Sequence, residues 1–121
     1  MRLSEMSTDV ALDKICEITP YAMGIAEDKE FMKMFVKKAF VKEDAKPEAI
    51  REAAYKMTLD KIKKFVPIVL KKHREDVFGV LSVLNEKSIE EISKQPVTVT
   101  IKECIDVFND KELLDFFTSL M

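Results

Sequence analysis

His73 is the only histidine in the chain and the first candidate for a chemical role. An imidazole can serve as a general base, but such a reaction also needs a nucleophile or an orienting carboxylate held in place. Glu75 and Asp76 follow His73 too closely in the sequence to indicate that arrangement. We therefore predict a structural role for His73, as a polar residue at the start of a helix.

The cysteines and glycines form no catalytic or metal-binding pattern either. Cys16 and Cys104 lie far apart and have no motif partner, so we interpret them as reduced, buried thiols of a cytosolic protein. Gly24 and Gly79 stand alone in unrelated contexts, and neither belongs to a phosphate-binding loop. Capping at helix starts explains two adjacent acidic pairs, Glu27–Asp28 and Glu90–Glu91. The sequence thus predicts no enzyme, no cofactor and no metal site.

Charge is distributed unevenly along the chain. Residues 37–85 hold 12 Lys and Arg against 7 Asp and Glu, a net charge of +5, whereas residues 1–36 hold 4 against 7 and residues 86–121 hold 4 against 8. A solvated surface is the simplest interpretation. The more specific one is self-complementarity, in which the acidic end of one subunit meets the basic middle of the next. The basic band consists of Lys61, Lys63, Lys64, Lys71, Lys72 and Arg74, and the acidic surface lies near Asp106, Asp110, Glu112 and Asp115.

The C-terminal segment LLDFFTSLM predicts a second binding feature. Its apolar side chains cover more than one face of a short helix, so one face can pack on the core while the rest contacts a partner. In a head-to-tail contact, Phe116 and Phe117 would supply the apolar anchor. The predicted protein-binding residues are Leu113, Phe116, Phe117 and Leu120 from this segment, with Lys64, Lys71, Lys72 and Arg74 from the basic band.

Two central helices are predicted to position these residues. The stretch Leu59–Leu84 has apolar residues at helical steps of three and four, which place them on one face turned to the core. Pro67 lacks a backbone N–H and should bend or break the helix. We therefore predict a central helical hairpin, on which the rest of the chain packs.

The remaining helices are predicted from caps and prolines. Ser7 or Thr8 can cap a first helix whose apolar stripe includes Val10, Leu12 and Ile18, and Thr19–Pro20 should end it. Further expected boundaries are a short helical turn over Tyr21–Ala26, a helix capped by Asp28 and running to about Phe40, a polar linker over residues 41–47 and a helix that begins at Pro47.

The C-terminal third has equally clear local signals. Ser88 and Glu91 have capping-box spacing, so a short helix with inward-facing Ile89 and Ile92 should start there and end before Pro96. Residues 97–101 are the only strand candidate, but the spacing of the apolar residues that follow favours a helix. Asn109–Asp110 should cap the last helix.

Composition favours one all-α domain over residues 1–121, an irregular bundle of about six or seven helices. The chain is 47% hydrophobic and 35% charged, with two glycines and no tryptophan. A net charge of −2 argues against generic nucleic-acid binding. A nucleic-acid site is the third and weakest interpretation of the basic band, because Phe65 is the only aromatic residue within it and the flanking segments are acidic. The longest apolar run, Phe65–Leu70, is far too short to span a membrane, and no apolar N-terminal segment predicts export. We expect a soluble, cytosolic protein.

Several segments resemble one protein family over nearly the whole chain. The opening RLSEMSTDVALDKICEITPY, the central VPIVLKKHREDVFGVLSVLN, the segment IEEISKQ and the closing DKELLDFFTSL are similar to phage tail assembly chaperones. These are small all-helical proteins encoded in the tail-gene clusters of long-tailed phages and prophages of Gram-positive bacteria. The resemblance is one of overall pattern, without a catalytic signature.

The resemblance implies a non-enzymatic protein that self-associates as a ring or spiral and coats the tape-measure protein. It would keep that long helical protein soluble while tail-tube subunits polymerise around it, and a frameshifted longer form would contact the tail-tube protein. It implies no nucleic-acid or membrane partner. The competing interpretation is a helical adaptor or regulatory module that binds one protein through the apolar C-terminal segment.

Overall fold

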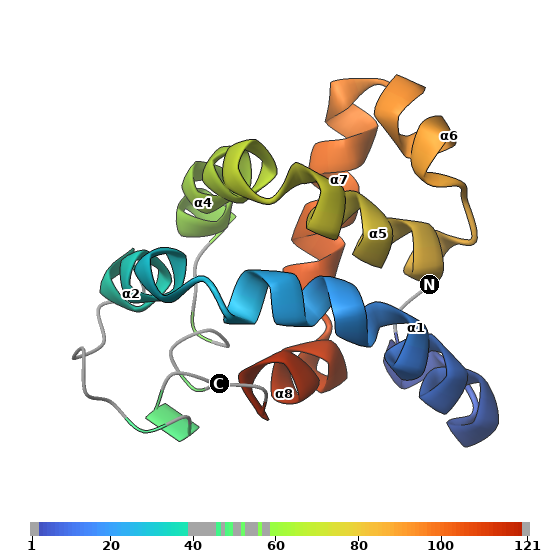
Figure 1. The fold of residues 1–121 in the computed structure, drawn as a ribbon, viewed down its shortest axis with the longest axis horizontal. Coiled ribbons are helices and arrows are strands. Elements are labelled where there is room, and N and C mark those ends of the chain that lie inside the picture. The colour runs from blue at the N-terminus through green and yellow to red at the C-terminus, as the bar shows by residue number, and fades with distance from the viewer. Residues whose placement is uncertain are drawn as a thin grey trace.

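The computed structural model describes residues 3–38 and 59–119, together with the single positions 46, 48, 49, 52 and 56. Within these residues the chain forms seven α-helices and one 3-10 turn, without a strand (Figure 1). The prediction of an all-α bundle is confirmed. The elements are η1 (Leu3–Glu5), α1 (Thr8–Ala26), α2 (Lys29–Lys38), α4 (Leu59–Lys72), α5 (Arg74–Asn85), α6 (Ile89–Lys94), α7 (Val97–Phe108) and α8 (Lys111–Ser119).

Helix α1 begins where the sequence predicts but continues through Pro20 to Ala26. The Ser7 hydroxyl accepts the Val10 N–H and so caps the helix, as expected. The predicted end at Thr19–Pro20 is wrong, and Tyr21–Ala26 is the last part of the same helix. Burial explains this, because Ile18, Ala22 and Ile25 lie in the core on both sides of the proline. Burying three apolar side chains outweighs the roughly 3 kcal/mol that an interior proline costs.

Helices α4 and α5 meet at His73 rather than at Pro67. The backbone of His73 has φ −129° and ψ 43°, which no α-helix accommodates, whereas Pro67 lies inside α4 with its ring exposed. The two predicted helices are therefore present, but a break at Pro67 is wrong. Buried residues before and after the proline, among them Phe65 and Val69, hold α4 together.

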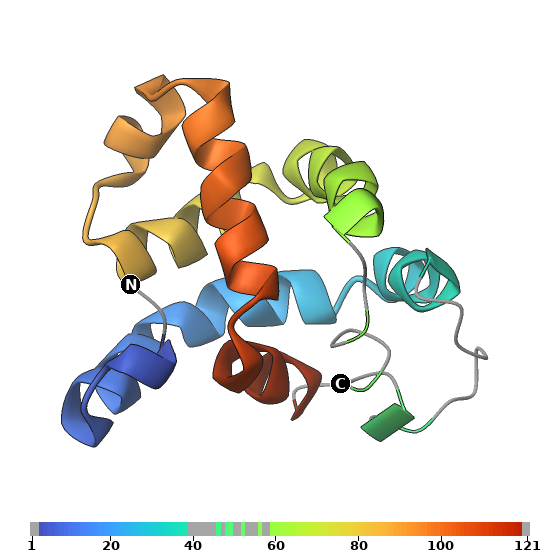
Figure 2. The ribbon, with the colours of Figure 1, turned by 180° about the vertical axis from the view of Figure 1, so that it is seen from behind.

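The main partner of α5 is α1, and α4 packs mainly on α7, so α1 shares the centre of the bundle with the predicted pair (Figures 1 and 2). Both glycines lie at the α1–α5 contact. A Cβ atom on Gly79 would stand 2.3 Å from the ring of Tyr21, and one on Gly24 would stand 2.7 Å from the Asp76 carboxylate. Each glycine thus lets α1 and α5 approach closely, because a side chain at either position would meet a residue of the opposite helix.

The C-terminal third follows its local signals closely. Ser88 and Glu91 form the predicted capping box at the start of α6. Pro96 precedes α7, and residues 97–101 are helical as favoured. Of the two isoleucines predicted to face inward, Ile92 is buried, but Ile89 is 41% exposed.

The described core consists of two apolar clusters. The larger surrounds Phe31, Phe65, Val66 and Leu81, between α2, α4, α5 and α7. The smaller joins Leu3, Ile18, Ala22, Leu84 and Leu113, and so ties η1 and α8 to α1 and α5. The predictions for Phe40, Pro47, Leu120 and Met121 lie outside the described residues, and of the predicted 41–47 linker only Lys46 is described. No helix in the described part of the chain is long and apolar enough to cross a membrane.

Candidate protein-binding surface

The predicted basic band forms one exposed face of α4 and the start of α5. Lys63, Lys64, Pro67 and Lys71 are all exposed and follow each other at helical spacing, and Arg74 is exposed just beyond the break. Within the described ranges, Lys63, Lys64, Lys71 and Arg74 form no ion pair with another residue. These four cations have no ion-pair partner among the described residues and can therefore face an acidic surface.

Two members of the band differ from this description. Lys61 is half-buried and already interacts with a neighbouring group. Lys72 is exposed, but its charge acts on the carboxylate of Asp28. The part of the band that can face a partner is therefore Lys63, Lys64, Lys71 and Arg74, which we call the α4 stripe.

The predicted acidic surface is only partly available. Asp106, Glu112 and Asp115 are exposed, but Asp110 is 2% exposed and belongs to the fold. Its Oδ2 accepts the Leu3 N–H at 2.6 Å, and its Oδ1 accepts the Leu113 N–H at 3.2 Å. The expected cap on the last helix is thus confirmed, and the same carboxylate is removed from the set that could contact another subunit.

Helix α8 turns its apolar side chains to the core. Leu113 and Leu114 are 4% and 6% exposed, and Phe116 and Phe117 are half-buried. All four line an apolar cavity of about 110 Å³ between α8 and the central helices. Of the residues predicted to bind a partner here, Leu113 is therefore unavailable, and the two phenylalanines are engaged in packing. Leu120 lies outside the described residues.

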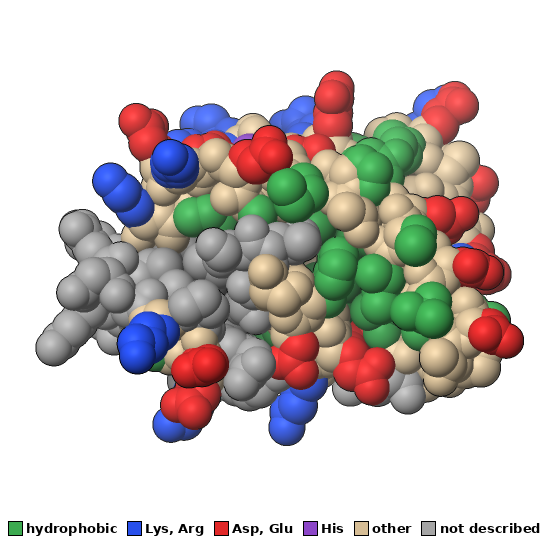
Figure 3. All heavy atoms as spheres, turned by 60° about the horizontal axis from the view of Figure 1, so that its bottom comes forward, with side chains coloured by type: hydrophobic (Ala, Val, Ile, Leu, Met, Phe, Trp, Pro, Cys, Tyr) green, Lys and Arg blue, Asp and Glu red, His purple; other side chains and the backbone are tan. Residues whose placement is uncertain are grey.

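An open groove lies between the start of α1, the end of α5 and α7. Its volume is about 760 Å³, and its apolar surface comes from Met6, Val10 and Val99. Val10 is 45% exposed and Val99 is 37% exposed, so the expectation that Val10 faces the core is wrong. Glu5 and Asp106 also line the groove. Figure 3 shows the face of the molecule that lies below the view of Figure 1, where hydrophobic side chains gather over one half and acidic side chains lie at its edge; the groove is not marked in that view.

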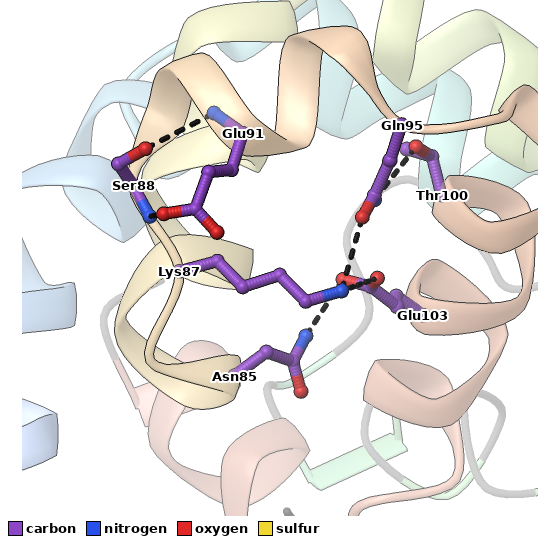
Figure 4. Close-up of polar contacts among 7 residues, drawn as sticks. All are labelled: Asn85, Lys87, Ser88, Glu91, Gln95, Thr100 and Glu103. Atoms are coloured by element: carbon purple, nitrogen blue, oxygen red, sulfur yellow. Dashed lines mark hydrogen bonds and ion pairs between the residues drawn. The ribbon is translucent and has the colours of Figure 1, made fainter.

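A polar network fixes the wall of this groove (Figure 4). Glu103 of α7 accepts hydrogen bonds from Asn85 at 2.8 Å and from Lys87 at 3.1 Å. Lys87 also donates to Gln95 at 3.0 Å, and Gln95 donates to the buried Thr100 at 2.9 Å. The network connects the end of α5, α6 and α7 and so fixes their positions relative to one another. The end of α5 and α7 form part of the groove wall. Nothing in the sequence signals the network, because its members are up to 18 positions apart.

His73 lies at the start of α5 as predicted, but it also links two distant junctions. Its Nε2 faces Asp28 Oδ2 at 2.8 Å, and its Nδ1 faces Asp76 Oδ2 at 3.3 Å. The ring packs edge-on against Phe31, with ring centres 5.0 Å apart. The His73 side chain is only 12% exposed, so the arrangement ties the α1–α2 turn to the α4–α5 turn. The sequence predicts Asp28 only as a helix cap; its contact with His73 joins residues 45 positions apart, which no spacing in the sequence indicates.

Asp28 provides a prediction for the pH dependence of stability. The pKa of its carboxyl is lowered from 3.8, first because the carboxylate accepts the Phe31 N–H and then because of the hydrogen bond to His73. A lowered pKa contributes stability above the unfolded-state value, and this contribution is lost as pH falls through the folded-state value. Asp28→Asn should therefore lower the thermal midpoint near neutral pH and make it fall less steeply between about pH 5 and pH 3. Thermal unfolding followed by circular dichroism measures this. Glu27→Gln, at the exposed neighbouring position, is the control and should keep the wild-type slope.

The two cysteines have different environments. Cys104 is buried, and burial raises the pKa of its thiol to about 12, so it behaves as a small apolar residue. Cys16 is exposed, so its interpretation as buried is wrong. Among the described residues, no group of three or more His, Cys, Asp and Glu side chains could hold a metal ion.

Comparisons of this chain with known proteins found no matching family model, no matching curated protein and no matching solved structure.

Proposed function

We propose that this protein is a non-enzymatic tail assembly chaperone that self-associates and binds the tape-measure protein of a long-tailed phage or prophage. The observation that carries the proposal is the charge layout of the folded chain. Among the described residues, Lys63, Lys64, Lys71 and Arg74 form an exposed stripe without ion pairs. Within the same residues, Glu5 and Asp106 in the groove at the start of α1 form no ion pair either. The sequence resemblance adds the identity of the elongated partner.

Separate donor and acceptor surfaces suit a protein that coats a long molecule. When the two surfaces differ, each contact leaves one of each kind free, so assembly continues as a ring or a spiral. Every added subunit then extends the covered length of the tape-measure protein. A longer, frameshifted form would extend the same assembly towards the tail-tube protein.

The alternative is a helical adaptor that binds a single protein partner. It is favoured by the open groove, whose exposed valines would suit one apolar segment of a regulator. The two functions predict different gene neighbourhoods. A tape-measure gene directly downstream supports the chaperone, whereas a regulatory gene cluster supports the adaptor.

Co-expression with the downstream tape-measure protein tests the proposal. We expect the tape-measure protein to remain in the soluble fraction and to co-purify with this chain, in complexes that contain many copies of it. Lys64→Glu/Lys71→Glu should reduce the recovered complex by about tenfold, because reversing two charges converts attraction into repulsion worth roughly 1–2 kcal/mol.

The matched control is Lys33→Glu/Lys94→Glu, which changes net charge equally at exposed positions outside the stripe and the groove. It should keep the wild-type yield. A tape-measure protein that stays insoluble with the wild-type chain, while the chain itself is folded and abundant, would refute the proposal. Recovery of a one-to-one complex with a different protein would favour the adaptor.

A further inference from the structure

We infer that the groove formed by the start of α1, the end of α5 and α7 receives the α4 stripe of a second copy of this chain. The inference rests on the self-association in the proposed function and names the two surfaces that meet. In this inference the groove is the acidic partner of the stripe, in place of the α8 surface predicted from the sequence. Asp110 and Leu113 of that surface are buried, and Phe117 packs on both core clusters.

The groove has the chemistry that a lysine-bearing helix needs. Its apolar surface, from Met6, Val10 and Val99, can cover the hydrocarbon stems of lysine side chains. Glu5 and Asp106 can receive the ammonium groups, because neither forms an ion pair with another described residue. The other two acids of the groove are already engaged, Glu86 with Lys14 and Glu103 with Lys87.

The stripe has the complementary chemistry. Lys63, Lys64 and Lys71 extend from one exposed face of α4, with Pro67 between them in place of a charged or bulky side chain. Among the described residues that line the groove, three charged side chains form no ion pair: Glu5, Asp106 and Lys102. Their charges sum to −1. Complementary charge of this kind sets orientation and rate of association more than affinity, so the valines must supply part of the binding energy.

The two surfaces lie on different sides of the molecule (Figure 1). Helix α4 is in the left half of that view, whereas the start of α1 and the end of α5 are in the right half, with α7 between them. One chain therefore cannot satisfy its own groove, and a contact between two copies leaves a free stripe and a free groove. The polar network around Glu103 keeps the groove in shape before the partner binds, which reduces the entropic cost of association.

Charge reversal on each surface tests the inference. The groove variant is Glu5→Lys/Asp106→Lys, and the stripe variant is Lys64→Glu/Lys71→Glu, both at exposed positions. Each variant alone should associate at least tenfold more weakly than wild type, measured by sedimentation velocity over a concentration series at low salt. Mixed in equal amounts they should associate again, because the two glutamates introduced in the stripe of one variant then face the two lysines introduced in the groove of the other.

The control is Glu30→Lys/Glu112→Lys, which changes the net charge as much as the groove variant does, at two exposed positions outside the groove. Glu112 lies on α8, so the control also tests the surface of that helix. It should associate like wild type. If wild type associates and the groove variant associates equally well, or if the folded variants do not recover on mixing, the inference is overturned while self-association stands. A wild-type chain that remains monomeric at every concentration refutes self-association itself, and with it the proposed function.

Discussion

Replacing Asp110 with alanine is expected to lower the free energy of unfolding by about 3 kcal/mol. The substitution removes a charge-assisted acceptor from two backbone N–H groups, those of Leu3 and Leu113. Loss of a helix cap costs about 1 kcal/mol, and leaving a buried N–H without a partner costs a further 1–3 kcal/mol. Because Leu3 is 1% exposed, water cannot readily replace the carboxylate.

Urea denaturation followed by circular dichroism measures this change. Asn109→Ala is the control, because Asn109 precedes Asp110, is exposed, and its side chain forms no hydrogen bond with another described residue. This variant should change the free energy of unfolding by no more than about 0.5 kcal/mol. Asp110→Asn should give an intermediate loss, since its amide keeps one acceptor oxygen for two donors. Equal stability of Asp110→Ala and Asn109→Ala would contradict the anchoring role of Asp110.

Replacing Gly79 with alanine is expected to destabilise the protein by about 2 kcal/mol, although alanine is the better helix former by roughly 1 kcal/mol. The new Cβ would lie 2.3 Å from ring atoms of Tyr21, so α1 and α5 would have to separate or the ring would have to move. Tyr21→Leu should relieve the clash, so the double variant should lose less stability than the two single variants added together.

Gly24→Ala is the matched comparison for Gly79→Ala. Its Cβ would meet the end of the Asp76 side chain, which can turn away more easily than a ring can. We expect a smaller loss of stability, together with weaker contact between Asp76 and His73. A Gly79→Ala variant that is more stable than wild type would show that the close approach of the two helices does not constrain the fold. Chemical denaturation of all four variants, including Tyr21→Leu and the double variant, decides between these outcomes.

The revised binding surface changes how earlier expectations about α8 should be tested. Phe117 packs against both core clusters, so Phe117→Asp would disturb folding as well as any contact between subunits. Loss of association in that variant would therefore not identify an interface. Glu5, Asp106, Lys64 and Lys71 are better positions, because all four side chains are exposed and can be changed without opening the core.

The sequence alone determined the features that depend on residues a few positions apart. The cap at Ser7, the capping box of Ser88 with Glu91 and the cap at Asp110 were all predictable, since each joins a side chain to a backbone group three residues away. The all-α class was predictable for the same reason, because helical periodicity is a local pattern. The basic stripe on α4 also follows from spacing along one helix.

Only the tertiary structure decided the features that join distant parts of the chain. Pro20 and Pro67 lie inside helices because burial on both sides outweighs their local cost, and sequence rules weigh only that cost. Asp110 meets Leu3 across 107 positions, and His73 meets Asp28 across 45. The groove likewise combines η1, α1, α5 and α7. Such contacts arise from how helices pack, so no spacing within the sequence specifies them.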